Sequence, residues 1–316
     1  DVFSKDIVLK KHHSTLYMSQ FTIIEGYFDI QGKQYISNSL FKKHYQLTIQ
    51  KGFIVDLFDL YLDEDCPYGD ETTDLLGIEG NGRLRIMSRE HGVAACVDEL
   101  AAFYRKKGLE VIAHVREGGE FNPHDVVFEA KGDLRQLFKL WRISQTFLSM
   151  VCAIAATTRL YLETARKVNK HVIIATSRKT HPGMRRFELE AVRAGGGDHH
   201  RNSLSDSILI TQNHLGVAGD LNEIQAVRRI EIEPRNEEEA LRYAHIADLL
   251  LLDHLPPQDI QRLAPLLKEK NPNLRIAVGG ISAQEIPDYA PLVDIIVISA
   301  PYYAPPLDLT ARIYRI

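Results

Sequence analysis

The sequence predicts an α/β fold in which a mixed α+β half precedes a half built from repeated βα units. The main observation is a change of pattern at about Leu134. Beyond it, short apolar runs of strand length recur at residues 172–176, 207–211, 229–233, 248–253, 275–278 and 294–299. Helical segments separate most of them, for example residues 237–245 and 257–270. Repeated units of this kind require parallel strands joined by right-handed crossovers, so we expect either a doubly wound sheet or a closed barrel.

Polar residues at the ends of these runs favour the barrel. They are Arg178, Asn213, Glu233, Asp253 and the pair Gly279-Gly280. Side chains that follow successive parallel strands meet at one mouth of a barrel, where α/β barrels bind their ligands. Ahead of these units, residues 142–156 and 158–168 predict two helices.

The first half mixes strands and helices without regular alternation. Residues 20–50 alternate apolar and polar positions, and residues 28–36 predict a hairpin around Gly32. The elements expected after it are a turn at residues 65–70, a strand near 82–88, a helix over 93–107 that Gly108 ends, a strand over 109–115, turns at 118–119 and 122–123, and a strand near 125–130. We therefore expect an α+β domain.

The bulk composition argues against several classes of protein. The 316 residues are 45% hydrophobic and 25% charged with a net charge of −4, which is typical of a soluble globular protein and gives no electrostatic footprint for nucleic acid. Cys66, Cys96 and Cys152 lie far apart and form no CxxC pair, so we expect reduced thiols and a cytoplasmic protein. The longest apolar stretches, such as residues 147–158, fall short of a membrane span, and the first residues lack the layout of a signal peptide.

Cations and glycines are concentrated in Arg178-Lys-Thr-His-Pro-Gly-Met-Arg185 and in the following Gly195-Gly-Gly-Asp-His-His-Arg201. Arg178 and Lys179 come after an apolar run, so they should emerge at the carboxyl end of a buried strand. Arginine forms bidentate pairs with carboxylate or phosphate, and lysine supplies a point charge. Together they predict an anionic small molecule with more than one acidic group. The alternative is a solvated basic turn beside a glycine linker.

Two carboxylates and two glycines extend this prediction. Glu233 and Asp253 end successive apolar runs, and such a pair suits ribose hydroxyls or a magnesium ion that arrives with diphosphate. Another interpretation is that Asp253 caps the turn before Pro256. Gly279-Gly280 follows a strand and precedes a helix, as in barrel loops that bind phosphate, although a plain tight turn would need the same glycines.

Several longer motifs are similar to those of one enzyme family. They are Arg178-Lys-Thr-x-Pro-Gly-x-Arg185, Glu188-x-x-Ala-Val-Arg193-x-Gly-Gly-Gly197, His200-Arg201, Leu204-x-Asp206 and Asn213-His214. Together they resemble the quinolinate phosphoribosyltransferase family, whose members are also called nicotinate-nucleotide pyrophosphorylases. The resemblance extends from about Phe53 to the C-terminus and includes Glu64-Asp-Cys-Pro-Tyr-Gly-Asp70-x-Thr-Thr73. The ending at residues 299–308 looks more like the ModD branch of the family.

The resemblance implies a fold and a set of domains. An α+β sandwich domain over residues 51–140 would pack on an incomplete parallel α/β barrel over residues 141–300, which would carry the active site. Residues 301–316 would return to the sandwich domain, and residues 1–50 would be a β-rich extension outside the resemblance. It also implies a homodimer or higher oligomer whose sites receive Arg142 from the partner chain, with small-molecule substrates and no nucleic-acid or membrane partner.

The site residues that the resemblance implies fall into three groups. The catalytic residues would be Lys179, Glu233 and Asp253; the substrate-binding residues would be Arg142, Ser177, Arg178, Lys179, His200, Arg201 and Thr211; and the phosphate-binding residues would be Gly279, Gly280 and Ser299. Glu233 and Asp253 would also hold Mg²⁺ indirectly, through the ribosyl diphosphate. In the family, the quinolinate nitrogen attacks C1 of phosphoribosyl pyrophosphate, diphosphate leaves, and the adduct decarboxylates to nicotinate mononucleotide.

Three positions depart from the pattern of the family. Thr211 stands where the family places a second substrate-facing lysine, Val278 replaces a serine, and His254 replaces an asparagine. We therefore expect a phosphoribosyltransferase whose base carries fewer or differently placed acidic groups, with quinolinate favoured among named bases. The alternative is a ModD-type accessory protein of molybdenum transport that binds an anion without turning over quinolinate.

Overall fold

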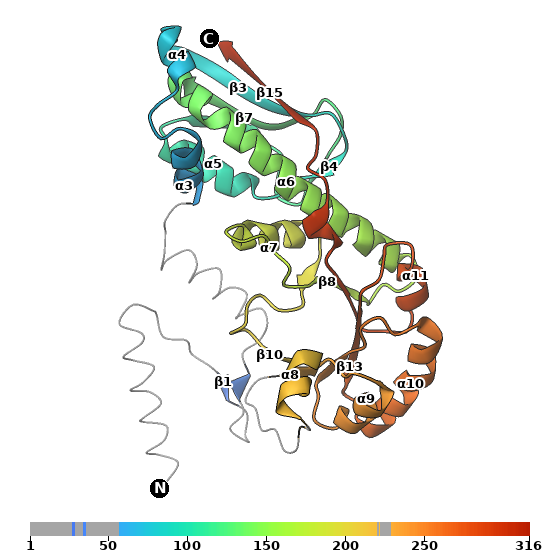
Figure 1. The fold of residues 1–316 in the computed structure, drawn as a ribbon. Helices are drawn as coiled ribbons and strands as arrows, with labels where there is room; N and C mark the ends of the chain where they lie inside the picture. Colours follow the sequence, from blue (N-terminus) through green and yellow to red (C-terminus); the bar gives the residue numbers. More distant parts are fainter. Residues whose placement is uncertain (1–26, 29–33, 36–56, 220, 222–228) are drawn as a thin grey trace. The chain divides into compact units, whose positions relative to one another are not determined.

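The computed structural model describes residues 27–28, 34–35, 57–219, 221 and 229–316 of the chain (Figure 1). The chain divides into two compact units, residues 1–64 and residues 65–316. In the first unit, β1 (Tyr27–Phe28) pairs antiparallel with β2 (Gln34–Tyr35). This pairing agrees with the predicted hairpin, and the turn expected at Gly32 lies outside the described residues. Helix α3 (Leu57–Asp65) follows.

The second unit begins with an α+β domain, as the sequence predicts. Its antiparallel sheet has the strand order β15-β3-β7-β5. The strands are β3 (Asn81–Ser88), β5 (Glu110–His114), β7 (Val126–Asp133) and β15 (Leu309–Arg315), and β4 (Gly92–Val93) and β6 (Glu120–Phe121) form a separate pair. Helix α4 (Glu71–Leu75) precedes β3, and α5 (Val97–Lys106) ends before Gly108, as expected.

The two faces of this sheet differ because alternate residues of β3 point to opposite sides. Leu84 and Ile86 are fully buried, whereas Arg83 lies on the other face and is partly exposed. Helix α5 covers the buried face through Tyr104, whose ring meets Phe128 edge-on at a centroid distance of 4.8 Å. Sheet and helix therefore share one apolar core.

The second half of the chain forms a seven-stranded parallel sheet in the order β10-β11-β12-β13-β14-β8-β9. The strands are β8 (Ile173–Thr176), β9 (Asp198–His199), β10 (Ile208–Ile210), β11 (Ile230–Ile232), β12 (Leu249–Leu251), β13 (Arg275–Gly279) and β14 (Ile295–Ile298). All but β9 fall on the predicted apolar runs. Because the first strand, β8, pairs with the last, β14, the sheet closes on itself; among the described residues its ladder is interrupted only between β9 and β10. The predicted incomplete α/β barrel is confirmed.

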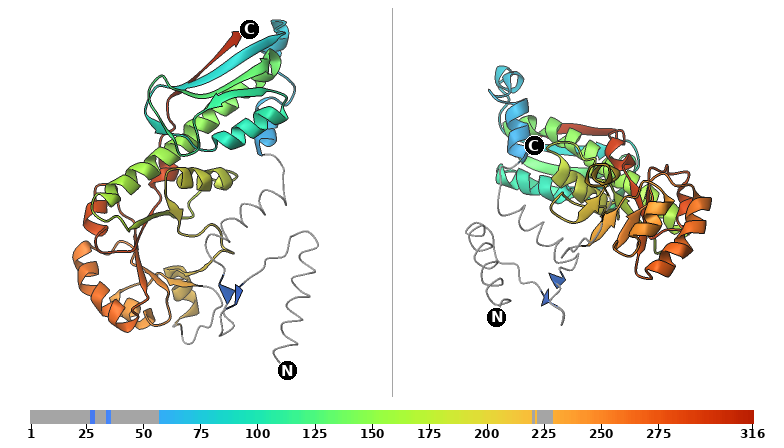
Figure 2. Two further views of the ribbon diagram at one scale, coloured as in Figure 1. Left: turned by 180° about the vertical axis from the view of Figure 1, so that it is seen from behind. Right: turned by 60° about the horizontal axis from the view of Figure 1, so that its bottom comes forward.

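Helices cover the outside of the barrel, and a small apolar layer fills its inside. The helices are α7 (Arg185–Ala194), α8 (Gln212–Ala218), α9 (Glu237–Tyr243), α10 (Pro257–Lys270) and α11 (Ile286–Tyr289), of which α9, α10 and α11 line the outer side of the sheet in Figure 2. Ile230 and Ile232 of β11 pack with these helices. Residues such as Leu251 and Val297 form the inner layer. Asn213, expected at the end of a strand, lies in α8 and is exposed.

A single long helix, α6 (Leu134–Arg166), connects the two halves of this unit. The prediction of two helices is wrong, because the helix runs unbroken through Thr158, which is fully buried and donates its hydroxyl hydrogen to the Ile154 carbonyl at 2.8 Å. Helix α6 contacts β3, β7 and β15 as well as β8, α7 and α11. By length and composition it could cross a membrane, contrary to expectation, but 56% of its apolar window is buried inside the structure, as in the core helix of a globular protein.

Candidate active site

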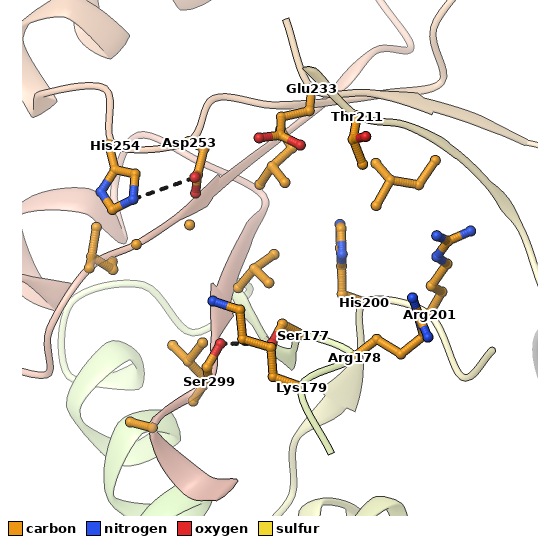
Figure 3. Close-up of a pocket in the computed structure, with 18 residues that line it drawn as sticks. Ser177, Arg178, Lys179, His200, Arg201, Thr211, Glu233, Asp253, His254 and Ser299 are labelled. Carbon is orange, nitrogen blue, oxygen red and sulfur yellow. Dashed lines mark hydrogen bonds and ion pairs between the residues drawn. The ribbon is translucent and has the colours of Figure 1, made fainter. Parts of the chain in front are cut away.

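A cavity of about 580 Å³ lies at the carboxyl ends of the parallel strands (Figure 3). This volume is typical of small-molecule sites. The lining contains every site residue that the family resemblance implies except Arg142, namely Ser177, Arg178, Lys179, His200, Arg201, Thr211, Glu233, Asp253, Gly279, Gly280 and Ser299. Its other lining residues are Leu209, Leu251, His254, Ile281, Val297, Ile298 and Ala300. Every strand from β8 to β14 therefore contributes to one mouth, as the barrel prediction requires.

The guanidiniums of Arg178 and Arg201 lie on one side of this cavity, whereas the Lys179 side chain points toward Ser299 (Figure 3). Arg178 and Lys179 follow β8, and Arg201 follows β9. Burial lowers the pKa of Arg201, and the nearby Arg178 guanidinium lowers that pKa further. The Arg201 side chain is held by its Nη1, which donates to the Ser207 carbonyl at 3.2 Å. Two guanidiniums held close together repel each other, and an anion bound between them would remove that cost.

Two carboxylates lie apart from the guanidiniums. Figure 3 shows Asp253 across the cavity from Arg178 and Arg201, with Glu233 between Asp253 and Thr211. Burial raises the pKa of Glu233, and the Asp253 carboxylate raises it further. Helix α10 begins after Pro256 without a side-chain cap, so the structure does not support the alternative in which Asp253 caps this turn. Asp253 instead places Oδ2 3.5 Å from His254 Nε2.

Close packing requires the two glycines at the end of β13, Gly279 and Gly280. A Cβ atom at Gly279 would lie 2.5 Å from Asp253 Oδ1, and one at Gly280 would lie 2.1 Å from the His254 ring. Gly280 also has a φ of +73°, which side chains other than glycine rarely adopt. The backbone of this loop is therefore exposed to the cavity beside Asp253, where its amides can approach a phosphate.

Hydroxyl groups complete the polar lining. Ser177 and Ser299, at the ends of β8 and β14, hydrogen-bond to each other at 2.7 Å. Thr211 is the N-cap residue of α8, and its Oγ1 lies 2.7 Å from His214 Nδ1 in a capping box. Where the family pattern would place a lysine, the cavity thus has an uncharged side chain whose hydroxyl already has a partner.

Two family models match successive parts of the chain. The model of the quinolinate phosphoribosyl transferase N-terminal domain matches residues 70–152, and that of its C-terminal domain matches residues 154–312. The chain belongs to the quinolinate phosphoribosyltransferase family. The family resemblance seen in the sequence motifs is confirmed.

Relatives and solved structures of this family cover most of the chain. A protein of Archaeoglobus fulgidus described as a carboxylating nicotinate-nucleotide pyrophosphorylase is 31% identical over 79% of this chain and 100% of its own length. A protein of Pasteurella multocida described as the pyrophosphorylase ModD is 28% identical over 81% of this chain and 96% of its own. The crystal structure of NadC from Streptococcus pyogenes is 25% identical over 85% of this chain and 99% of its own, with a TM-score of 0.76. Both branches named in the sequence comparison are therefore represented.

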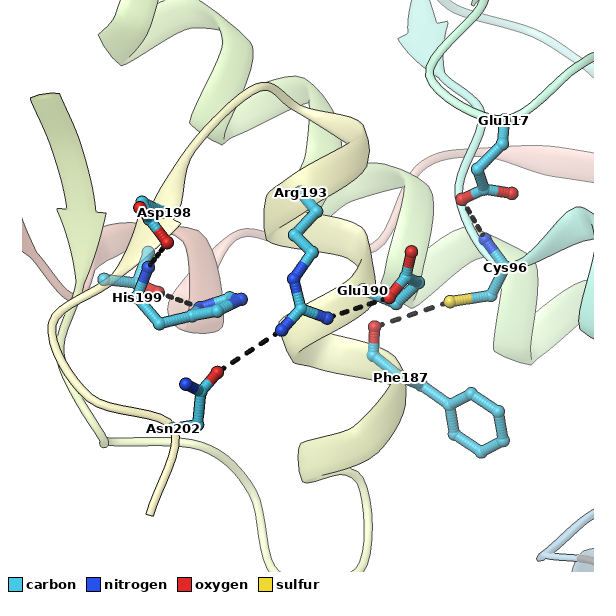
Figure 4. A network of polar contacts seen from close by, with 9 residues as sticks. Cys96, Glu117, Phe187, Glu190, Arg193, Asp198, His199 and Asn202 are labelled. Carbon is cyan, nitrogen blue, oxygen red and sulfur yellow. Dashed lines mark hydrogen bonds and ion pairs between the residues drawn. The ribbon is translucent and has the colours of Figure 1, made fainter. Parts of the chain in front are cut away.

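Family motif residues outside the cavity brace the loops that line it (Figure 4). Arg193 on α7 donates through Nη1 to Glu190 at 2.9 Å and through Nη2 to Asn202 Oδ1 at 3.3 Å. Asn202 in turn donates its backbone and side-chain N–H groups to Asp206 at 2.8 and 2.7 Å. This chain of contacts ends beside Arg201, so it restrains the loop that presents that guanidinium. No role for Arg193 or Asn202 was predicted.

A buried carboxylate fixes the loop after β8. The Glu188 side chain is fully buried on α7 and accepts the His181 backbone N–H at 2.9 Å. His181 Nδ1 lies 2.6 Å from the other carboxylate oxygen. The segment that carries Arg178 and Lys179 is thereby tied to α7.

The glycine run at residues 195–197 does not line the cavity. A Cβ atom at Gly195 would lie 2.5 Å from the Ala155 carbonyl oxygen, and one at Gly197 would lie 2.6 Å from Thr158 Cγ2. The run therefore lets the end of α7 lie directly against α6. Our expectation that these glycines contribute to the anion site is not supported, although the flanking His200 and Arg201 do line it.

Arg142 lies on α6 and is exposed. Its guanidinium sits 4.0 Å from the centre of the Trp141 ring, and its Nη1 lies 3.4 Å from Gln145 Oε1. It is not among the residues that line the cavity of its own chain. Any contact between Arg142 and a substrate would therefore be made in the cavity of another copy of the chain.

His254 and Glu231 were not predicted as site residues. His254 lines the cavity with a φ of +56°, a conformation in which Asn, Asp and His are enriched among residues other than glycine. This explains how a histidine can stand at a position where the family uses asparagine. Glu231 lies behind the lining and contacts His200.

The donor set suits magnesium only as part of a substrate complex. In the part of the chain that the structure describes, no group of three or more His, Cys, Asp or Glu side chains could hold a metal ion. Among the residues that line the cavity, Glu233 and Asp253 supply carboxylate oxygens, the ligand type that Mg²⁺ prefers, and the Asp253 carboxylate raises the pKa of Glu233. The pair therefore fits an ion that brings further oxygen ligands with it.

Proposed function

We propose that the chain is a phosphoribosyltransferase that joins an acidic nitrogen heterocycle to phosphoribosyl pyrophosphate and releases diphosphate. Quinolinate is the first candidate for the heterocycle, and the product would then be nicotinate mononucleotide. The observation that supports this proposal is the division of one cavity into a side with two guanidiniums and a side with two carboxylates and a glycine loop. This function agrees with the names of the family relatives.

The cationic side would bind the base. Arg178 and Arg201 can each form a bidentate pair with a carboxylate, and their mutual repulsion favours an anionic ligand. His200 and Ser177 lie in the same lining. The charges thus select a heterocycle that carries at least one acidic group.

The other side would bind the ribosyl diphosphate. Glu233 and Asp253 would hold ribose hydroxyls together with the Mg²⁺ of the diphosphate, while Gly279, Gly280 and Ser299 would contact phosphate oxygens. Bound Mg²⁺ would neutralise charge that develops on the departing diphosphate. Lys179, whose side chain points into the cavity near Ser299 (Figure 3), would add a fixed cation for the same charge.

The reaction needs the two ligands to be held in line. The ring nitrogen of the base forms a bond to C1 of the ribose as the C1–O bond to diphosphate breaks, and diphosphate leaves with the bonding electrons. With quinolinate, the carboxylate next to the ring nitrogen then departs as CO₂ and a proton takes its place on the carbon. Positioning of the reactants by opposite sides of one cavity supplies much of the rate enhancement in such a step.

Calorimetric titration with magnesium phosphoribosyl pyrophosphate, followed by quinolinate and a diphosphate assay, tests the proposal. We expect saturable binding and diphosphate release in the presence of both ligands. Binding without release would show that quinolinate is not the base, and absence of binding would contradict the phosphoribosyltransferase function.

The oligomer is part of this proposal. We propose a homodimer, or a higher oligomer, in which the exposed Arg142 reaches the partner's cavity, in a protein of the cytoplasm. Arg142→Ala alone should then lose activity, and mixing it with Asp253→Ala should restore some sites, because a mixed dimer has one cavity with both groups intact. Absence of recovery in mixed dimers of confirmed composition would contradict the exchange of Arg142.

A ModD-type accessory protein is the second candidate. Thr211 favours it, because it puts an uncharged side chain in the cavity lining where the family pattern has a lysine. Val278, the other departure that suggests this candidate, is buried in the core and does not line the cavity. This candidate predicts binding of an oxyanion such as molybdate without any requirement for phosphoribosyl pyrophosphate. Calorimetric titration with molybdate distinguishes the two candidates, because the accessory protein should bind molybdate in the absence of phosphoribosyl pyrophosphate.

A further inference from the structure

Glu231 places a carboxylate in the apolar inner layer of the barrel. Its neighbours in β11, Ile230 and Ile232, pack toward the helices, so Glu231 points to the inner side of the sheet. Its register partners on the adjacent strands are Leu209 and Leu249. Only 7% of the Glu231 side chain is exposed. A carboxylate in such surroundings is costly unless it is paired.

The partner of this carboxylate is His200, which lines the cavity. His200 Nε2 forms a hydrogen bond with Glu231 Oε1, and the His200 side chain is 6% exposed. The His200 backbone N–H donates to the Thr176 carbonyl at 2.9 Å, so the residue is also held on β8. Because an ionised carboxylate can only accept, Nε2 carries the hydrogen and Nδ1 is the ring nitrogen that remains for a ligand.

The stability of the fold does not explain why Glu231 and His200 are paired inside the barrel. A buried hydrogen bond contributes little net stability, because both partners lose their contacts with water, and replacing both by apolar groups of the same shape can be neutral or stabilising. The inner layer around Glu231 is built from leucine, isoleucine, valine and alanine, so an apolar residue would fit there. The placement of a carboxylate behind a cavity-lining histidine therefore points to a role in the site.

We propose that Glu231 is a positioning residue for the base, because it fixes which ring nitrogen of His200 faces the cavity. Beside the two guanidiniums, Thr211 has its hydroxyl engaged by His214, so His200 Nδ1 supplies the added directional contact to the base. The contact to the base rests on the proposed function, whereas the orientation of the ring does not. Outer partners that orient a metal-binding histidine change activity about 10- to 100-fold when removed, and we expect an effect of similar size for a histidine that binds the base.

Four variants and a control measure this effect. Glu231→Leu removes the acceptor, whereas Glu231→Gln keeps an amide oxygen that accepts from Nε2. Since both remove the charge, the difference between them reports the hydrogen bond. His200→Ala and the double variant Glu231→Leu/His200→Ala complete a mutant cycle. Glu239→Gln is the control, because Glu239 is also buried and paired, with Arg235, but lies on α9.

We expect Glu231→Leu to lower kcat/KM for the base by about tenfold or more through KM, while Glu231→Gln and Glu239→Gln stay within about threefold of the parent. The dissociation constant for magnesium phosphoribosyl pyrophosphate should be the same in Glu231→Leu and Glu231→Gln. In the His200→Ala background, Glu231→Leu should change kcat/KM less than about twofold, because coupled residues are not additive. Fully multiplicative losses, or an equal loss of phosphoribosyl pyrophosphate affinity, would overturn the proposal.

A second measurement does not depend on turnover. Long-range ¹H–¹⁵N spectra of the two ring nitrogens of His200, assigned with the His200→Ala variant, should show hydrogen on Nε2 in the parent and in Glu231→Gln, with this selection lost in Glu231→Leu. A parent protein with bare Nε2 overturns the inference, whatever its activity. If the spectra agree but no diphosphate is released, the proposed function fails and the orientation of His200 by Glu231 stands.

Discussion

Thr211→Lys is the substitution that tests how this cavity selects its base. Thr211 lines the cavity near Glu233 and carries no charge, and its hydroxyl caps α8. A lysine here would present an ammonium group on the side where the base is expected to bind. We therefore expect a gain in affinity for quinolinate, which has two carboxylates, and a smaller gain for a base with one.

The expected gain in the binding free energy of quinolinate follows from three contributions. An ammonium group about 4 Å from a carboxylate gains about 4 kcal/mol at an effective dielectric constant of 20. Ordering the long side chain removes about 2 kcal/mol of this gain. Repulsion from Arg178 and Arg201, which already lowers the pKa of Arg201, reduces it further. What remains is about 1.4 kcal/mol, or about tenfold in affinity. Loss of the cap costs about 1 kcal/mol of stability but acts on folding rather than on binding.

Steady-state kinetics with quinolinate over a range of concentrations would measure this change. Thr211→Met is the matched control, since it has a similar length, lacks the charge and also loses the cap. The two variants should show the same small decrease in Tm, and only the lysine should lower KM. If the lysine has no effect on KM, or if methionine has the same effect, the reasoning from charge is refuted.

Three further predictions concern the carboxylates, the glycine loop and the half-buried Glu117. Asp253→Ala and Glu233→Ala should each reduce diphosphate release by about a hundredfold or more without a change in the circular-dichroism melting curve; activity retained in both would contradict their assignment to the site. Gly280→Ala should destabilise the protein by about 1–2 kcal/mol in denaturant unfolding because of its positive φ and its approach to His254, and it should weaken phosphoribosyl pyrophosphate binding. Gly216→Ala, on α8 with open space around it, should do neither. Burial raises the pKa of Glu117 to about 7 from an ordinary 4.5, so wild-type stability attributable to this group is lost as pH rises from about 4.5 to 7. The Tm of Glu117→Gln relative to wild type should therefore be higher at pH 8 than at pH 5, and an unchanged difference would show that Glu117 ionises normally.

The sequence was sufficient for the parallel strands because each is an apolar run flanked by polar residues. Residues 248–253 and 294–299 illustrate this, since their strands are buried on both faces. The boundary inside α6 was misplaced because two consecutive threonines weaken the helical pattern, while the burial of Thr158 against the rest of the structure leaves no trace in composition. Strand β9 was missed because two residues carry no periodicity.

Residues of the site were predictable where a motif or a strand end marks them. Arg178, Glu233 and Asp253 belong to this class, and the structure brings them to one cavity. Glu231 could not be assigned in this way, because in sequence it is one polar residue in a short strand, and only the pairing of β11 with its neighbours shows that it points inward. The glycines at residues 195–197 were wrongly expected at the anion site. Close packing against α6 and close approach to a phosphate both require glycine, so the sequence does not distinguish the two.

The pairing of β15 with β3 has a consequence for synthesis on the ribosome. These strands join Leu309 to Ser88 and Arg315 to Gly82, and the whole parallel sheet lies between them in sequence. Arg89 and Asp308, which form an ion pair at this junction, are 219 residues apart. At ordinary rates of translation, β15 is synthesised about 10 to 40 seconds after β3. During that time the open edge of β3 can pair with other nascent chains. Completion of the antiparallel sheet is therefore a late event, and the barrel must be made before the first domain can finish folding.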